Sequence, residues 1–192
     1  HPLSVVVGRN TDAAKPSITC PANNIIGGCG TESLTGLIYS ETTVEITKDQ
    51  FNTAGGTASD DCGIVYYGYQ DSKSGTCPIV VTRVFTVKDL TGNSATCNQT
   101  ITIKDTIAPV VPANGGSTIT CLSSAVTPIT PVVIDNCGSN INPAFVSMVD
   151  SPNPLTCEGM RVYTYSYTDC AENSSTWTYT YAIEREDFVM PP

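Results

Sequence analysis

One segment of this chain recurs eighty residues further along without a gap. The recurring pairs are Thr76-Cys77 with Thr156-Cys157, Asp89 with Asp169, and Asn93-Ser94 with Asn173-Ser174. A pattern that returns at a fixed spacing is typical of repeated structural units, each of which forms the same fold. The sequence therefore predicts two copies of one unit.

Alternating residues predict a β-hairpin in each copy. Apolar and polar side chains alternate along Val80–Lys88 and along Ser94–Lys104, which is typical of strands with one buried face. Between them, Asp89-Leu90-Thr91-Gly92-Asn93 supplies Asp, Gly and Asn where a tight turn needs them. The second copy shows the same alternation along Val162–Tyr167 and Ser175–Ile183.

Length and composition indicate the fold class. The chain has 192 residues. Two copies therefore have roughly 85–95 residues each, near the ~100 residues of an immunoglobulin-like sandwich. Thr, Val, Ile and Tyr are frequent, and no long stretch keeps a helical period. We predict an all-β chain of two tandem immunoglobulin-like β-sandwich domains stapled by disulfides.

Two similar links indicate the domain boundaries. Asp12 precedes Pro16 by the same spacing at which Asp105 precedes Pro109. The predicted segments are 1–15, the tail of a preceding repeat or a linker, 16–107, the first repeat, and 108–192, the second repeat.

The first unit carries an insertion that the second lacks. The corresponding cysteine pairs, Cys29 with Cys62 and Cys121 with Cys137, are 33 and 16 positions apart, a difference of 17. The extra residues fall within Thr31–Ser59, where Thr47-Lys48-Asp49-Gln50 fits a capping box before a short helix. Two interpretations stay open: a packed surface decoration, or a ligand-contacting loop on a rigid scaffold.

The acidic balance of the chain argues against several classes of partner. The formal net charge is −9, with only nine Lys and Arg residues. Nucleic acids and anionic membrane surfaces bind basic faces, so we expect neither partner. No run of 18 apolar residues occurs, so we expect no membrane span in this fragment. The expected partners are neighbouring repeats of the same chain, which is itself expected to be a monomer.

Aromatic side chains alternate on the last two predicted strands. They are Tyr163, Tyr165 and Tyr167 on one strand and Trp177, Tyr179 and Tyr181 on the next. The first interpretation is cross-strand packing in the core, and the second is an exposed face that stacks on sugars.

The residues give little support for catalysis. His1 is the only histidine of the sequence, so no Ser-His-Asp or Cys-His site is expected within the fold. No GxSxG or P-loop motif occurs. We therefore predict that the chain is not an enzyme.

Acidic residues occur at the links and turns, where calcium is the candidate ion. Calcium takes several oxygen ligands, mostly from carboxylates and carbonyls. The turns that carry Asp60, Asp61, Asp89, Asp135 and Asp169 are expected at one end of an immunoglobulin-like fold. The candidate ligands are Asp12, Asp105, Asp89, Asp169 and Asp187. The alternative is ordinary turn aspartates with solvated charges.

Several motifs together resemble a known family. They are Ile18-Thr19-Cys20-Pro21-Ala22-Asn23, Ser59-Asp60-Asp61-Cys62-Gly63, Thr76-Cys77-Pro78, Asn93-Ser94-Ala95-Thr96-Cys97 and Asp105-Thr106-Ile107-Ala108-Pro109. Their order resembles HYR-type (hyalin-repeat-like) immunoglobulin-fold domains, which are arrayed in large cell-surface proteins of Bacteroidota, including giant gliding-motility adhesins. In that family the turn usually reads Asp-Ala-Cys-Gly-Asn. Here unit one has Leu90 and Thr91 in its middle, and unit two has Cys170-Ala171-Glu172.

This resemblance implies an exported, extracellular protein at the cell surface, carried by the type IX secretion route. The family's repeats are structural and adhesive, so the implied role is a stalk or adhesive filament, with surface polysaccharide as the candidate ligand. No catalytic residues carry over from the family. The alternative function is an accessory immunoglobulin-like region of a secreted polysaccharide-degrading enzyme.

Nine cysteines without CxxC pairs predict disulfides and an oxidising compartment. Unit two lacks counterparts of Cys20 and Cys97, where it has Val111 and Trp177. A bridge needs both halves, so the joint absence predicts the pair Cys20–Cys97. The rest of the scheme is Cys29–Cys77, Cys121–Cys157 and Cys137–Cys170, with Cys62 as a thiol. Cysteines alone permit many connectivities, so the scheme depends on this comparison of the two copies.

Overall fold

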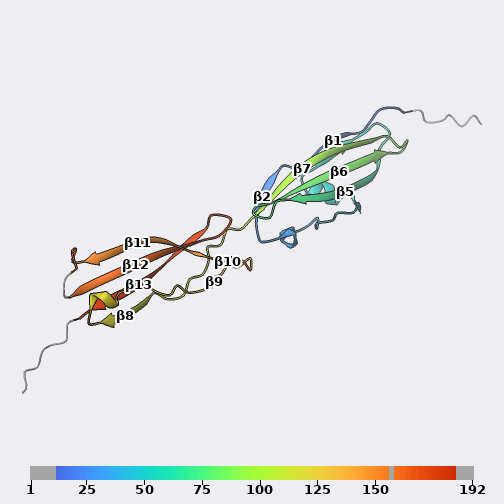
Figure 1. Cartoon of the computed structure of the whole chain (residues 1–192). Coiled ribbons are helices and arrows are strands. Elements are labelled where there is room, and N and C mark those ends of the chain that lie inside the picture. Colours follow the sequence, from blue (N-terminus) through green and yellow to red (C-terminus); the bar gives the residue numbers. More distant parts are fainter. Residues whose placement is uncertain (1–11, 156–157, 185–192) are drawn as a thin grey trace, which may run out of the picture. The chain divides into compact units, whose positions relative to one another are not determined.

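A computed structural model describes residues 12–155 and 158–184 of the chain. The chain divides into two compact units, His1–Lys104 and Asp105–Pro192. Strands make up most of the regular structure in each unit (Figure 1). The predicted all-β fold class, with two disulfide-stapled immunoglobulin-like units in tandem, is therefore confirmed. In the part of the chain that the structure describes, no helix is long and apolar enough to cross a membrane.

Unit 1 is built on a five-stranded sheet with the order β2-β7-β6-β5-β3, and β1 pairs with β4 in a second, smaller sheet. The strands are β1 (Ser17–Thr19), β2 (Asn24–Gly27), β3 (Val44–Ile46), β4 (Thr57–Ser59), β5 (Ile64–Ser74), β6 (Ile79–Asp89) and β7 (Ser94–Lys104). The hairpin predicted from alternation is confirmed as β6 and β7, which pair antiparallel.

The alternation of β6 determines which side chains form the core of unit 1. Val81, Phe85 and Val87 are buried on one face of the strand. Arg83 lies on the same face and is also buried, so a charged group occupies a core position. A buried charge is costly unless it is paired and hydrogen-bonded, and its partners are described with the site below.

The insertion of unit 1 folds into short elements that pack on the sheet. It contains the 3-10 helix η1 (Thr31–Ser33), β3 and the helix α1 (Lys48–Thr53). The predicted capping box is confirmed: Gln50 N–H donates to Thr47 Oγ1, and Thr47 N–H donates to Gln50 Oε1. The helix inserts Phe51, 1% exposed, into the core beside Phe85. The interpretation as a packed decoration therefore holds for this helix.

Unit 2 repeats the same plan with fewer elements. Its larger sheet has the order β11-β12-β13-β8, and β9 pairs with β10. The strands are β8 (Gly115–Ile119), β9 (Val133–Ile134), β10 (Asn140–Ile141), β11 (Pro143–Ser151), β12 (Gly159–Thr168) and β13 (Ser174–Ile183), with the 3-10 helix η2 at Leu122–Ser124. The second predicted hairpin is confirmed as β12 and β13.

The first long-sheet strand of each unit runs parallel to the last, with a different register in the two copies. Asn24 of β2 lies opposite Ile101, and Gly115 of β8 lies opposite Tyr179. Aligning the Pro-Ala-Asn motifs makes Gly115 the counterpart of Asn24, and the eighty-residue repeat makes Tyr181 the counterpart of Ile101. An identical register would therefore place Gly115 opposite Tyr181. β8 is thus displaced by two residues, and an even shift keeps each side chain on its original face.

Candidate functional site

The hairpin turn of each unit is closed by one aspartate and one asparagine. In unit 2, Asp169 Oδ1 accepts from the backbone N–H groups of Ala171 and Asn173, and Asp169 Oδ2 accepts from the Asn173 side-chain amide at 2.8 Å. In unit 1, Asn93 donates to Asp89 in the same way. These short-range bonds hold both aspartate side chains in fixed positions.

Thr91 adds a hydroxyl donor to the turn of unit 1. Its Oγ1 lies 2.9 Å from Asp89 Oδ1, a bond that Ala171 does not provide at the corresponding position of unit 2. Burial raises the pKa of Asp89, but hydrogen bonds from Asn93 and Thr91 outweigh that effect and hold the pKa below its usual value. The hydrogen bonds that Asp89 accepts therefore compensate for the burial of its carboxylate.

A second turn in each unit is also closed by an aspartate. Cys62 N–H donates to Asp60 Oδ1 at 2.9 Å, and Gly63 N–H donates to the Asp60 carbonyl. Asp135 has the same backbone arrangement with Gly138. Gly63 and Gly138 have φ of 78° and 83°, which glycine adopts without steric cost. In unit 2, this turn brings a carboxylate oxygen of Asp135 within 4.8 Å of one of Asp169.

The aspartate of each link joins the same end of its unit. The Asn93 amide donates to the Asp12 carbonyl at 3.0 Å, and the Asn173 amide donates to the Asp105 carbonyl at 3.2 Å. Asp12 therefore packs on the turn of unit 1, as Asp105 packs on the turn of unit 2. Residues 1–11 of the predicted tail lie outside the described residues.

Three buried carboxylates meet in unit 2. Asp105, Asp135 and Asp169 are 7%, 6% and 7% exposed. One carboxylate oxygen from each lies within 4.8 Å of the others. Among the described residues, the ion pairs are Arg83 with Asp71 and Arg161 with Asp150. The acidic centre of unit 2, defined as these three aspartates, therefore has no Lys or Arg partner within the described part of the chain.

The hydrogen bonds of this centre leave one oxygen without a donor. Asp135 Oδ1 is buried and has no hydrogen-bond partner, while Asp135 Oδ2 lies 3.4 Å from the Cys137 nitrogen. Burial raises the pKa of Asp105, but hydrogen bonds from Ile107 N–H and the Asn136 amide hold the pKa below its usual value. Asp105 is therefore negatively charged at neutral pH.

Unit 1 has a related but weaker acidic centre. Asp12, Asp60 and Cys62 place one ligand atom each within 4.8 Å of one another, and all three residues are half-buried. Asp12 Oδ2 is a buried oxygen without a hydrogen-bond partner. Asp89, the counterpart of Asp169, is not part of this group.

The predicted calcium ligands are only partly brought together. Asp105 and Asp169 meet in unit 2, Asp12 lies in the centre of unit 1, and Asp89 lies outside the unit 1 group. Asp187 lies outside the described residues. Asp135 and Asp60, which the ligand prediction left out, hold central places. Their signal is the Asp-x-Cys-Gly turn that both copies share.

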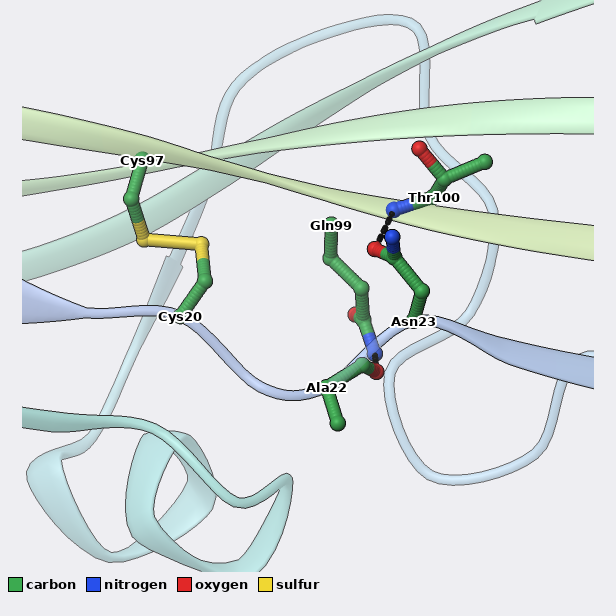
Figure 2. Close-up of a disulfide and its surroundings, with 6 residues drawn as sticks. All are labelled: Cys20, Ala22, Asn23, Cys97, Gln99 and Thr100. Carbon is green, nitrogen blue, oxygen red and sulfur yellow. Dashed lines mark hydrogen bonds between the residues drawn. A yellow bond between two sulfur atoms is a disulfide. The ribbon is translucent and has the colours of Figure 1, made fainter.

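A disulfide joins the start of unit 1 to its last strand. Cys20 and Cys97 are bonded with an S–S distance of 2.01 Å and a Cα–Cα distance of 5.7 Å (Figure 2). This is the pair that the joint absence in unit 2 predicts. Beside the bridge, Gln99 Nε2 donates to the Ala22 carbonyl and Thr100 N–H donates to the Asn23 side chain.

The remaining cysteines agree with the predicted scheme only in part. Cys29, Cys77, Cys137 and Cys170 are each disulfide-bonded, and the pairs Cys29–Cys77 and Cys137–Cys170 stay predictions. Cys121 is an exposed thiol in the structure, held 2.9 Å from Ser123 Oγ. Its predicted partner Cys157 lies outside the described residues, so that bridge stays a prediction, as does the thiol of Cys62.

The insertion of unit 1 also lines a cavity of about 500 Å³. The sheet contributes Asn24, Gln99 and Arg83, and the insertion contributes Leu34 and Gln50 among others. Pockets for small ligands combine apolar walls with a few polar groups. For the interpretation of the insertion as a ligand-contacting loop, this cavity is the candidate place of contact.

The aromatic residues of unit 2 pack inside its core. Tyr163, Tyr165, Tyr167, Trp177 and Tyr181 are all buried. Tyr165 and Trp177 are cross-strand neighbours with ring centroids 6.2 Å apart. The core-packing interpretation is right for these five side chains, because buried rings are not available for sugar stacking.

Comparison with protein families gives a match in unit 2. Residues 109–183 match the model of the HYR-like domain with 4 cysteines. The match supports an HYR-type repeat. This span contains four cysteines, Cys121, Cys137, Cys157 and Cys170. HYR-like domains are typically non-catalytic, and disulfide-bonded domains are typical of extracellular proteins.

The chain also has a distant likeness among solved structures. Among solved structures, the chain is similar to mouse clustered PcdhgC3 EC1-3, with 14% sequence identity and a TM-score of 0.30. That match covers 90% of this chain and 68% of the other. Comparison with curated proteins gives no match.

Proposed function

We propose that this chain is a non-catalytic segment of tandem repeats from a bacterial cell-surface adhesin, in which it forms part of a stalk or adhesive filament. The observation that carries the proposal is a hydrogen bond that both units share. In each unit, the asparagine of the hairpin turn binds the carbonyl of the link aspartate, Asp12 in unit 1 and Asp105 in unit 2. A unit that closes on the residue of its own link can be copied many times along one chain.

The finer assignment is an exported protein of Bacteroidota, carried by type IX secretion and acting in gliding motility. Its support is the order of motifs that resembles HYR-type repeats, together with the family match in unit 2. The disulfide Cys20–Cys97 also supports an oxidising location, because cytosolic thiols are kept reduced.

The parent protein tests this function directly. An adhesin predicts many further copies of the Asp-x-Cys-Gly turn and the Asp…Asn hairpin turn in the full-length gene. A catalytic domain next to only two such units would favour the alternative, an accessory region of a secreted polysaccharide-degrading enzyme.

The cavity of unit 1 is the candidate contact for a surface polysaccharide. Its amide side chains, including Asn24 and Gln99, can donate to and accept from sugar hydroxyls. A glycan array with the whole chain separates an adhesive repeat from a passive spacer. The variant Asn24→Leu should abolish any glycan signal, whereas Asn52→Leu, on the exposed surface of α1 away from the cavity, should retain it. An array without signal assigns the chain to the stalk.

A further inference from the structure

The acidic centre of unit 2 has a charge imbalance that the described residues do not correct. Asp105, Asp135 and Asp169 are all buried, and neither of the ion pairs among the described residues involves them. Burying carboxylates is unfavourable unless each is paired with a cation or fully hydrogen-bonded. Asp169 meets this condition through its turn, whereas the other two aspartates do so only in part.

One buried oxygen at this centre is open to a further ligand. Asp135 Oδ1 is buried without any hydrogen-bond partner, on a residue that is only 6% exposed. Asp105 Oδ2 lies 3.3 Å from Cys137 Sγ, but Cys137 is disulfide-bonded and a disulfide sulfur has no proton to donate. Asp135 Oδ1 therefore lacks a donor at a place where three carboxylates converge.

The donor atoms of this centre suit a calcium ion. One oxygen from each aspartate lies within 4.8 Å of the other two. Calcium binds carboxylate oxygens in flexible, irregular geometry, whereas magnesium demands near-ideal octahedral geometry and keeps several of its waters. Oxygen ligands alone also favour Ca²⁺ over softer transition metals.

We propose that Asp105, Asp135 and Asp169 bind one calcium ion in unit 2. The turn hydrogen bonds hold Asp169 in place before the ion arrives, and Asp105 brings the start of unit 2 to the same point. The ion therefore ties the link residue to both turns of its unit. The site is independent of the adhesin assignment, because it depends only on contacts within unit 2.

Unit 1 provides the matched control. Its corresponding group contains the sulfur of Cys62 in place of a third carboxylate, and a sulfur is a poor ligand for calcium. Asp60 of unit 1 occupies the place of Asp135. The variants Asp135→Asn and Asp60→Asn therefore remove the same carboxylate from the two copies, and only the first should affect calcium binding in unit 2.

The experiment uses the whole chain, with Trp177 as the reporter. Trp177 is the only tryptophan of the sequence and is buried in the core of unit 2, so its fluorescence follows the unfolding of that unit. Calcium-free protein and protein in about 10 mM CaCl₂ are heated in parallel, since extracellular sites bind with Kd values of roughly 10⁻⁴–10⁻³ M. Calcium should raise the unfolding midpoint of unit 2, because a ligand of the folded state stabilises it.

The effect of Asp135→Asn on the unfolding midpoint is expected to differ between the calcium-free and the calcium-bound protein. Without calcium, Asp135→Asn should unfold at the same or a higher temperature than the wild type, since it removes one of three buried negative charges. With calcium, Asp135→Asn should lose the shift, and Asp60→Asn should retain it. A carboxylate with a merely structural role would instead lower the midpoint equally in both conditions.

Three results would overturn the proposal: no calcium shift in the wild type, a full shift in Asp135→Asn, or loss of the shift in Asp60→Asn alone. If Asp135→Asn fails to fold, equilibrium dialysis of the wild type with radioactive calcium decides. One ion per chain, released by a chelator, supports the site, and no bound ion rejects it.

Discussion

Among the described residues, each unit has an aspartate–arginine pair across neighbouring strands, but the two pairs have very different surroundings. In unit 1, Arg83 Nε donates to Asp71 at 2.8 Å, and the side chains are only 4% and 0% exposed. In unit 2, Arg161 Nε donates to Asp150 at 2.7 Å, and the side chains are 18% and 16% exposed. The same chemistry is therefore a core element in one copy and a surface element in the other.

The insertion of unit 1 explains this difference. The guanidinium of Arg83 also donates to the carbonyls of Leu37 and Ile38, which belong to the insertion. Unit 2 has no such loop, and Tyr163 stands at the position that corresponds to Arg83. The comparison indicates that a core charge is tolerated here only because extra chain supplies its remaining acceptors.

The largest expected effect separates the two ion pairs. Asp71→Asn leaves the buried Arg83 without a counter-charge, which should cost about 3–5 kcal/mol of the unfolding free energy of unit 1. Asp150→Asn should cost no more than about 1 kcal/mol in unit 2, because a partly exposed pair is screened by solvent. Urea unfolding followed by circular dichroism measures both. Equal costs for the two variants would contradict the distinction between core and surface pairs.

The second effect concerns how each unit holds its first segment on its last strand. Unit 1 uses Cys20–Cys97 with a sequence separation of 77, whereas in unit 2 the Trp177 indole donates to the Ala113 carbonyl at 3.1 Å. The double variant Cys20→Ser/Cys97→Ser should therefore destabilise unit 1 by about 3 kcal/mol, mainly by freeing the unfolded chain.

Unit 2 is the internal control for this double variant when its unfolding is followed by calorimetry. The unfolding transition of unit 2, followed through Trp177 fluorescence, should keep its midpoint while that of unit 1 falls. An unchanged midpoint for unit 1 would mean that the bridge adds nothing beyond the packing of its strand.

A smaller effect arises in the hairpin turns. Gly92 has φ of 94° in unit 1, and Glu172, at the corresponding position of unit 2, has φ of 70°. A residue with a side chain in this left-handed conformation costs about 1 kcal/mol relative to glycine. Gly92→Glu should therefore destabilise unit 1 by about 1 kcal/mol, and Glu172→Gly should stabilise unit 2 by somewhat less. Chemical unfolding of each variant tests the pair, and a gain from Gly92→Glu would refute the strain argument.

The smallest effect is a pH dependence of unit 2. A hydrogen bond from Arg161 is the main cause that holds the pKa of Asp150 below its usual value. The resulting stabilisation is present above the unfolded pKa of about 3.9 and is lost as pH falls through the lower folded pKa. It should amount to less than about 1 kcal/mol. The wild type should therefore lose more stability on acidification than Asp150→Asn, as measured through Trp177 fluorescence; parallel pH profiles would contradict this.

Local patterns in the sequence predicted much of the fold. The hairpins follow from alternation, and helix α1 follows from the capping box of Thr47 and Gln50, because both signals depend on neighbouring residues. The pair Cys20–Cys97 was predictable because the two copies differ at both positions together. Internal repetition thus supplied long-range information that a single unit would not contain.

The candidate site was only partly predictable. Asp105 and Asp169 stood out at a link and a turn. The position of Asp135 beside them depends on how segments that are far apart in the sequence come together in the fold. The Asp71–Arg83 pair gave no local signal, since its members are twelve residues apart on two strands. Only the register between those strands brings them together.

The central claim, an exported repeat stapled by disulfides, is tested most directly by a thiol-trapping peptide map. Protein from its native cells is alkylated before lysis and digested without reductant. The account predicts one linked peptide that contains Cys20 and Cys97, with neither residue alkylated. Alkylation of both cysteines, or a bridge from either one to another cysteine, would contradict it.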